Sequence, residues 1–339
     1  MKQIFILLLF SVKIMAQEKE TINLSKSIKN DKNSIKTFTV IDQRPNKDIG
    51  SVMYHKDQVN VVFENNAEKD ITDWFYKNNP VRGKDNFVLL LENIEITEDK
   101  KEKYSIGKLN LRASTFIKKE DGYHLIYRKD TAATVSSRTT PYLAQSLSKK
   151  ITVIFTDLIK NSYQKTPWEF NVSGNELTNY ATLLKEKLEI FKTEKLNDGV
   201  YRDYYSFFTN RPEPGFILKT NDKGVVTKAI NGEEKEPIRR FYAFVHNGIA
   251  YKNIPVGYVE IFKNEQGLFI EAKKSDLFPE TSSNGAMIGG MAGGLVGAVI
   301  GAVIDASIQK KRSGVTGPEV YLDPFTGNYI LPEDFGKTK

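Results

Sequence analysis

In the first half of the chain, stretches with the apolar pattern of β-strands alternate with stretches that have the apolar pattern of helices. Residues 36–42 form a short β-rich run that ends in a turn signal. Apolar residues then recur at i, i+3 and i+4 within residues 65–78, which predicts an amphipathic helix. The next run, 87–96, is apolar on both faces at its start, so we expect it to be central in a sheet.

Two more strands and a long helix follow. Residues 104–118 alternate between apolar and polar positions, and 123–135 return antiparallel after a tight turn. Thr140 and Pro141 suit a helix start, because Thr caps free N–H groups and Pro tolerates the first helical position. The predicted order is β-α-β-β-β-α, which places the N-terminal domain in the α+β class.

The second half begins with a helical pattern, after which apolar residues recur at every second position, as in β-strands. Ser173 and Glu176 have the spacing of a capping box, and the helix is expected to run to about Lys195 with an apolar stripe that packs in a core. Three hairpins follow, including one with the turn Asn247-Gly248. Their strands are expected at 215–220 and 225–230, 240–246 and 249–252, and 258–263 and 268–272. Residues 321–331 are expected to return to this antiparallel sheet.

A stretch of about 20 residues, between Glu280 and Asp305, carries no charge and repeats glycine every four positions. The first row is Gly285, Gly289, Gly293, Gly297 and Gly301, and Gly290 and Gly294 belong to a second small row beside it. The remaining positions are mostly large and aliphatic. On a helix the two rows are adjacent and leave one smooth face. The predicted site residues of the chain are these seven glycines, in a helix-packing or membrane role.

Such a helix needs a partner. In water the seven glycines cost roughly 6–7 kcal/mol relative to alanine. In lipid, small residues four apart let two helix backbones approach closely, and 20 residues span about 30 Å. The segment resembles one arm of the glycine-zipper motif of bacterial outer-membrane surface antigens, which implies membrane association or self-association. Burial of the helix against the protein itself is the alternative.

The N-terminus predicts export. Lys2 provides a positive start, an apolar run follows from Ile4 to Phe10, and Ala16 precedes a polar change, so residues 1–16 are expected to be a secretory signal peptide. The chain contains no Cys that could accept a lipid. We expect the periplasm or outer membrane of a Gram-negative bacterium, with membrane association. Three cations at 310–312 follow the zipper and two at 273–274 precede it, so the positive-inside rule places the tail in the cytoplasm by a small excess. This conflicts with the return of the tail to an exported sheet. The two are compatible if the helix inserts reversibly or packs as an oligomer.

Composition narrows the chemistry further. The 339 residues include 49 Lys and Arg and 42 Asp and Glu, which gives a net charge of +7. Because the lysines alternate with glutamates, this charge indicates a solvated surface, and no nucleic-acid partner is expected. The absence of Cys and the presence of only three His leave little for redox or metal chemistry. No catalytic, cofactor-binding or metal residue is predicted, and no cofactor. Glu169, Glu176, Glu186 and Glu260 lack the spacing of an acid–base pair.

Two further resemblances concern the halves. The order of elements, with Val40-Ile41-Asp42-Gln43-Arg44 and Gly50, resembles small envelope lipoproteins typified by YajG, which implies an envelope-facing accessory domain. Asp42 and Arg44 are either a binding pair or a turn-locking pair, and their position on one strand face favours the second. The motifs at 199–201, 241–244 and 321–327 resemble uncharacterised exported proteins of Bacteroidota.

The predicted organisation therefore has five parts. They are a signal peptide at 1–16, an α+β envelope domain at 17–165, a helix plus antiparallel β domain at 166–283, the glycine-zipper helix at 284–306 and a tail at 307–339 that returns to the β domain. The expected function is that of a non-enzymatic, exported envelope protein whose zipper serves membrane association or self-assembly. The alternative is a soluble periplasmic binding or assembly module with the zipper buried in protein. Any small-molecule ligand is left undefined.

Overall fold

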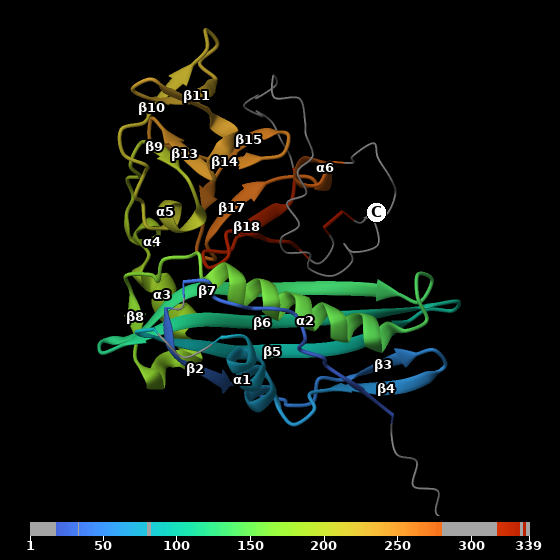
Figure 1. The fold of residues 1–339 in the computed structure, drawn as a ribbon. Coiled ribbons are helices and arrows are strands. Elements are labelled where there is room, and N and C mark those ends of the chain that lie inside the picture. Colours follow the sequence, from blue (N-terminus) through green and yellow to red (C-terminus); the bar gives the residue numbers. More distant parts are fainter. Residues whose placement is uncertain (1–17, 33, 80–82, 280–316, 333–334, 337–339) are drawn as a thin grey trace, which may run out of the picture.

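The computed structural model describes residues 18–32, 34–79, 83–279, 317–332 and 335–336 (Figure 1). The described chain mixes helices with mostly antiparallel sheets, which confirms the α+β class. The predicted signal peptide and the glycine zipper both lie outside the described residues.

A five-stranded central sheet organises the first half, in the order β2-β5-β6-β7-β8. β2 is parallel to β5 and the other neighbours are antiparallel. The strands are β2 (Ile35–Asp42), β5 (Asp85–Lys100), β6 (Ser105–Lys119), β7 (Gly122–Ser136) and β8 (Asn171–Val172). The apolar start of β5 lies between two neighbours and is fully buried, so its predicted central position is confirmed.

Two helices, α1 (Ala67–Asn78) and α2 (Leu143–Ser162), cover one face of this sheet. Their apolar faces and the sheet form the first core, which includes Phe38, Ile71, Trp74, Phe75, Leu89, Leu91, Ile151 and Phe155. The predicted cap at Thr140 is wrong, because Pro141 O accepts a hydrogen bond from His55 N and Tyr142 bridges to Tyr54. These contacts keep residues 141–142 out of the helix, which begins at Leu143.

The predicted order of elements omits a small three-stranded sheet that packs against α2. Its order is β1-β4-β3, with β1 (Lys19–Thr21), β3 (Ser51–Tyr54) and β4 (Asp57–Val62). The hairpin between β3 and β4 turns at His55, which adopts a positive φ of 59°. Because a turn of this kind favours Gly, Asn or Asp, a histidine there gives little sequence signal.

The other face of the central sheet is covered by the second half, and the two together form the second core. Its members include Val88, Leu90, Phe116, Leu125, Trp168, Tyr180, Ile270, Val320 and Phe325. The predicted domain boundary at 165 lies between α2 and β8, and β8 pairs with β7 of the central sheet. The second core therefore draws residues from both sides of that boundary.

The long helix predicted from Ser173 to about Lys195 is broken into three. These are the 3₁₀ helix η1 (Gly174–Asn179), α3 (Tyr180–Lys187) and α4 (Glu189–Lys192). The predicted capping box is present, with Glu176 Oε2 accepting from Ser173 N at 2.8 Å. The break falls at Leu188, whose extended ψ of 127° lets its side chain enter the second core.

Two antiparallel sheets carry the first two of the three predicted hairpins. One has the order β15-β14-β13-β9, the other β10-β11-β12, and a small third core of Phe244, Tyr251, Tyr258 and neighbours packs there. The turn Asn247-Gly248 has positive φ at both residues, as a two-residue hairpin requires. The elements are β9 (Gly199–Tyr201), α5 (Tyr204–Phe208), β10 (Ile217–Thr220), β11 (Val226–Asn231), β12 (Glu234–Pro237), η2 (Ile238–Arg240), β13 (Ala243–His246), β14 (Ile249–Ile254) and β15 (Gly257–Glu260).

A last four-stranded sheet, which we call the exit sheet, has the order β16-β17-β18-β19. It contains β16 (Phe262–Lys263), β17 (Leu268–Glu271), β18 (Glu319–Leu322) and β19 (Tyr329–Ile330), and α6 (Lys274–Leu277) follows β17. The single strand predicted at 258–263 is divided at Ile261 between two sheets. The predicted return of 321–331 to a sheet is confirmed, because β18 pairs with β17.

Candidate functional site

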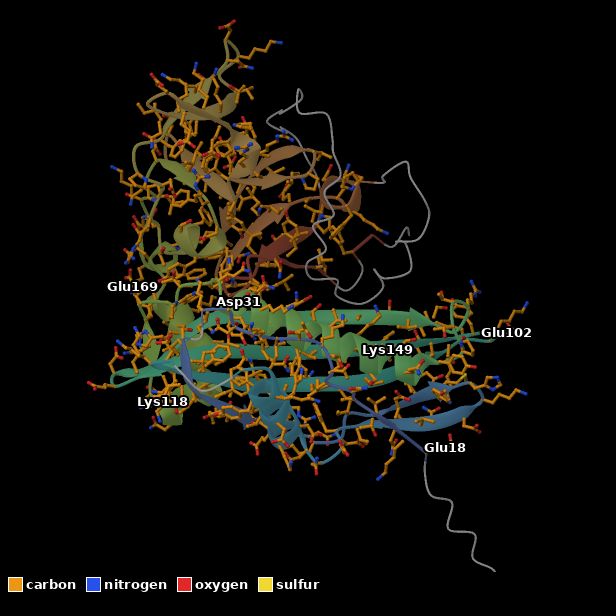
Figure 2. The ribbon with its side chains drawn as sticks, viewed as in Figure 1. Glu18, Asp31, Glu102, Lys118, Lys149 and Glu169 are labelled. Atoms are coloured by element: carbon orange, nitrogen blue, oxygen red, sulfur yellow. The ribbon has the colours of Figure 1, made fainter. Side chains whose placement is uncertain are left out.

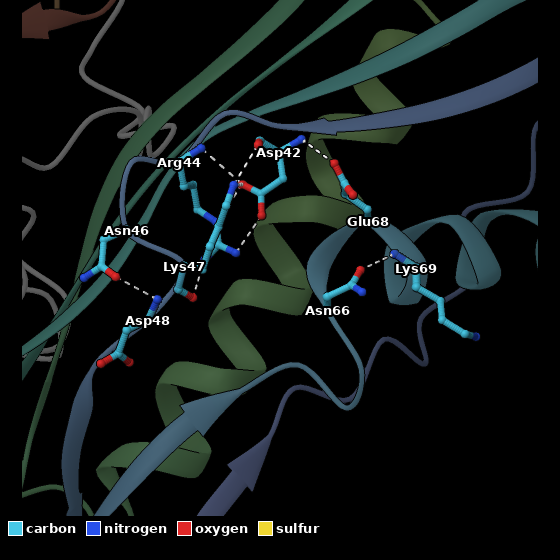
Figure 3. A network of polar contacts seen from close by, with 8 residues as sticks. All are labelled: Asp42, Arg44, Asn46, Lys47, Asp48, Asn66, Glu68 and Lys69. Carbon is cyan, nitrogen blue, oxygen red and sulfur yellow. Dashed lines mark hydrogen bonds and ion pairs between the residues drawn. The ribbon is translucent and has the colours of Figure 1, made fainter.

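Asp42 and Arg44 form a buried ion pair at the end of β2 (Figure 3). Arg44 Nε donates to Asp42 Oδ1 at 2.9 Å and Nη2 donates to Oδ2 at 2.8 Å, a bidentate arrangement. The two side chains are only 3% and 7% exposed. The backbone N–H of Arg44 also donates to Asp42 Oδ1, which closes the turn after the strand. This geometry agrees with the turn-locking interpretation.

The loop that follows is held by the same pair. Lys47 Nζ donates to Asp42 O at 2.7 Å, and Arg44 Nη1 donates to Lys47 O at 3.3 Å. Gly50 ends the loop with a φ of +108°, and a Cβ there would lie 2.2 Å from the carbonyl oxygen of Ile96. Only glycine therefore allows the loop to press against β5.

Two opposing effects act on the pKa of Asp42. Burial alone raises it, but the hydrogen bonds from Arg44 and Lys47 outweigh burial and hold the pKa below its ordinary value. The carboxylate is thus charged at neutral pH, with cations on both oxygens. It is poorly suited to act as a general acid or base.

The N-terminus of α1 faces this pair. Glu68 Oε1 accepts from the backbone N–H of Asp42 at 3.2 Å, and Asn66 caps the helix by accepting from Lys69 N at 2.8 Å. Figure 3 shows both contacts beside the Asp42 loop. Glu68 therefore connects the helix to the end of β2, while Asn66 satisfies a backbone group of its own helix.

The same helix covers the edge of the central sheet. β2 is an edge strand, and the hydroxyl of Tyr76 accepts from Phe38 N at 3.0 Å and lies 3.3 Å from Phe38 O. With Glu68 on Asp42 N, side chains of α1 occupy the outward backbone groups at two points of the strand. An edge covered in this way is protected against pairing with another chain.

A cavity of about 450 Å³ opens between the loop and the helix. Ile49, Val61 and Ala67 form a buried apolar floor, and polar side chains surround it. The polar lining consists of Asp42, Arg44, Lys47, Asp48, Asn65, Asn66 and Glu68. The volume is that of a small-molecule site. Because three carboxylates face two cations, the lining suits a small neutral polar molecule better than an anion.

Two of the four glutamates considered in the sequence analysis, Glu169 and Glu176, have a structural role. Glu169 accepts two hydrogen bonds from Arg211, at 2.6 and 2.8 Å, and these lower its pKa. Glu176 belongs to the capping box. Within the described part of the chain, no group of three or more His, Asp or Glu side chains is arranged to hold a metal ion.

Lys252 is a buried residue that sequence reasoning missed. Its side chain enters from β14, and Nζ donates to Tyr242 O at 3.1 Å and Asn253 O at 2.9 Å, 4.0 Å from the centre of the Tyr242 ring. Burial lowers the pKa of this amine to about 7. A sequence signal existed, because Lys252 shares the inward period of Ala250 and Ile254.

Arg128 of β7 is a second missed residue, where the two halves meet. Its guanidinium lies 5.3 Å from the ring centre of Phe325, and Nη2 lies 3.6 Å from Glu92 Oε1. Glu92 Oε2 also accepts from Ser114 and from the hydroxyl of Tyr180. Because Tyr180 and Phe325 belong to the second core, we interpret these groups as a polar connection within it.

Charged side chains of both signs project from the ribbon, among them Glu102, Lys118, Lys149 and Glu169 (Figure 2). At the far end of the central sheet, Asp99 pairs with Lys101 at 2.9 Å and with Lys108 at 3.2 Å. This alternation of signs matches the interleaving seen in the sequence.

The seven predicted glycines of the zipper, Gly285, Gly289, Gly290, Gly293, Gly294, Gly297 and Gly301, lie outside the described residues. Among the helices that the structure describes, none has the length and apolar character needed to span a bilayer. No family model, curated protein or solved structure matches the chain. The likenesses to YajG-type lipoproteins, to glycine-zipper antigens and to exported Bacteroidota proteins therefore stay predictions.

Proposed function

We propose that this chain is a non-enzymatic, exported protein of a bacterial cell envelope, in which the segment 285–304 associates with a membrane or with a second copy. The observation that carries the proposal is the unbroken four-residue repeat of glycine in an uncharged stretch. Its length of about 30 Å as a helix and its smooth face suit close helix packing in lipid.

The described fold gives this proposal one support. The segment lies in sequence between β17 and β18, and these strands pair with each other. Ala272 N donates to Pro318 O at 3.3 Å, so the chain leaves and rejoins the exit sheet at one place. The sheet is therefore complete whatever the inserted segment binds.

The test of membrane association is fractionation of the producing cell. We expect the mature chain to remain with membranes after a carbonate wash and to resist extraction until detergent is added. Gly293→Leu with Gly297→Leu fills the smooth face and should abolish detergent-resistant oligomers. The matched control is Val299→Leu with Val303→Leu, which has the same spacing off the glycine row. Oligomers that persist equally in both variants would refute a packing role for the row.

Export has a separate test. The mature N-terminus of the chain recovered from a Gram-negative host should be Gln17, as the boundary after Ala16 predicts. An N-terminus that retains Met1 in the recovered protein would contradict export by this route.

A second candidate is a soluble periplasmic binding or assembly module whose zipper is buried in protein. The observation that favours it is the 450 Å³ cavity beside Asp42, which has the size of a ligand site. This candidate predicts complete release by carbonate, together with slow hydrogen exchange of the amides in 285–304.

A further inference from the structure

One face of the exit sheet carries a row of apolar side chains across all four strands. Phe262, Phe269, Tyr321 and Ile330 are successive cross-strand partners, and we call them the outer row. Their rings lie 5.5 Å apart from β16 to β17 and 5.7 Å apart from β17 to β18. The row is therefore continuous from one edge of the sheet to the other.

This face is not covered by the described protein. Phe262 is 39% exposed and Ile330 is 55% exposed, while the two aromatic residues between them are half-buried. The opposite face of the same strands carries Leu268, Ile270, Val320 and Leu322, all buried in the second core. An antiparallel sheet that faces water on one side normally shows polar residues there, so an apolar row calls for a partner.

The position of the row points to the kind of partner. β17 leads into the uncharged segment and β18 leads out of it. Gly285, the first glycine of the zipper, is six residues beyond Pro279, a reach of about 20 Å at most. Phe269 and Tyr321 are two residues, about 7 Å, from the ends of their strands on that side. A bilayer that takes up the segment is therefore within reach of this row.

We propose that the outer row of the exit sheet rests on the lipid surface, at the level of the headgroups, next to the inserted segment. The inference depends on the proposed membrane association. Aromatic rings with a polar tip, such as Tyr321, and apolar side chains suit the boundary between headgroups and acyl chains. Tyr321 keeps its hydroxyl bonded to Glu319 and Asn264 at the polar side of the row.

The charges beside the row determine which lipid is expected. Glu271 and Glu319 are direct cross-strand partners on this face. Two carboxylates facing each other give no attraction to anionic lipid, so contact through the row is driven by apolar burial. Binding to zwitterionic vesicles should therefore change little between low and high salt.

The test uses single-cysteine labels, which are site-specific because the chain has no native Cys. Ile330→Cys, in the full chain, receives an environment-sensitive fluorophore, and zwitterionic vesicles with brominated acyl chains are added. We expect a blue shift and strong quenching. Ile217→Cys is the matched control, because Ile217 is an exposed isoleucine, at 63%, in the separate sheet of β10. Its label should stay aqueous.

A label at Val296→Cys, within the zipper and off its glycine row, separates this inference from the proposed function. If the Val296 label responds to vesicles and the Ile330 label does not, the outer row is not a lipid contact, although membrane association stands. If neither label responds, the lipid contact and the membrane association both fail, and self-association of the segment is left to the test with Gly293→Leu and Gly297→Leu. If the Ile330 label is already apolar in buffer and vesicles change nothing, protein covers the row. Dilution then distinguishes a second copy from the chain's own segment, and either result overturns the lipid contact.

A second measurement does not depend on a label. Phe262→Ser combined with Ile330→Ser removes the two exposed members of the row and should weaken vesicle partitioning by roughly tenfold or more. Ile217→Ser should leave partitioning unchanged. Because the replaced side chains are exposed, far-UV circular dichroism of all three proteins should coincide, and equal partitioning of all three would overturn the proposal.

Discussion

Asp42 and Lys252 are both buried ionisable residues, but their charged forms are stabilised to different degrees. Asp42 has two cations on its carboxylate, and its pKa is held below the ordinary value. Lys252 donates to two carbonyl oxygens, and burial lowers its pKa to about 7. The first residue therefore stabilises the fold in its charged form, whereas the second destabilises it when protonated.

Arg44→Met should lower the free energy of unfolding by about 3 kcal/mol, because it leaves a buried carboxylate without its main partner. Urea denaturation measures the loss. Arg211→Met is the matched control. It removes a bidentate pair of similar geometry whose side chains are 55% and 63% exposed, and should cost less than about 1 kcal/mol. Equal losses would show that burial does not set the strength of the Asp42 pair.

The same pair predicts a dependence on acid pH. Because the folded pKa of Asp42 is depressed, its contribution is complete above the unfolded value, about 3.9, and is lost as pH falls through the folded pKa. The difference in unfolding free energy between the native chain and Arg44→Met should therefore shrink as the pH drops below about 4. A difference that stays constant down to pH 2 would contradict this assignment.

The lowered pKa of Lys252 predicts that the free energy of unfolding rises with pH in the alkaline range. Between its folded pKa of about 7 and its unfolded value near 10.4, only the unfolded chain binds the proton, so stability rises with pH. Relative to Lys252→Met, the native chain should gain on the order of 3 kcal/mol from pH 7 to pH 9.5. Parallel urea midpoints across this range would mean that the amine titrates normally.

At the scale of elements, the sequence predicted what depends on local patterns. Strands β5, β6 and β7 and the Asn-Gly hairpin follow from periodicity and turn residues. The hairpin of β3 and β4 and the break at Leu188 depend on tertiary burial, which no local period reports. The candidate site divides in the same way. Asp42 and Arg44 were recognisable from their spacing, whereas the wall formed by Glu68 requires α1 to pack on β2.

Gly50 lies where the loop after β2 contacts β5. Gly50→Ala should destabilise the protein by about 3 kcal/mol, because its Cβ would lie 2.2 Å from the carbonyl oxygen of Ile96 at an unfavourable φ. Gly224→Ala provides the comparison, since its φ is also positive but no atom lies within 4 Å, and it should cost only about 1 kcal/mol. Thermal unfolding of both variants measures the difference, and similar costs would rule out the clash as the cause.

At the scale of the whole molecule, the central sheet joins two cores. Leu89 and Leu91 of β5 point into the first, and Val88 and Leu90 point into the second. Alternate residues of one strand thus stabilise both halves. Phe325 strengthens the connection, stacking on Trp168 with ring centres 5.6 Å apart.

The chain's two tryptophans can test this coupling, since Trp74 lies in the first core and Trp168 in the second. In Trp74→Phe and in Trp168→Phe, the fluorescence of the remaining tryptophan should follow the same urea transition as the far-UV circular dichroism of that variant. A fluorescence midpoint displaced from the circular dichroism midpoint in either variant would show that the cores unfold separately.

The pairing of β17 with β18 also restricts topology. A membrane crossed once would have to separate Ala272 from Pro318, yet their backbone N and O atoms are 3.3 Å apart. While the exit sheet is intact, the proposed membrane association therefore keeps both flanks of the segment on one side of the bilayer. The excess of cations after the zipper then sets no orientation, since both flanks lie on the same side. Single-pass insertion requires the exit sheet to open first.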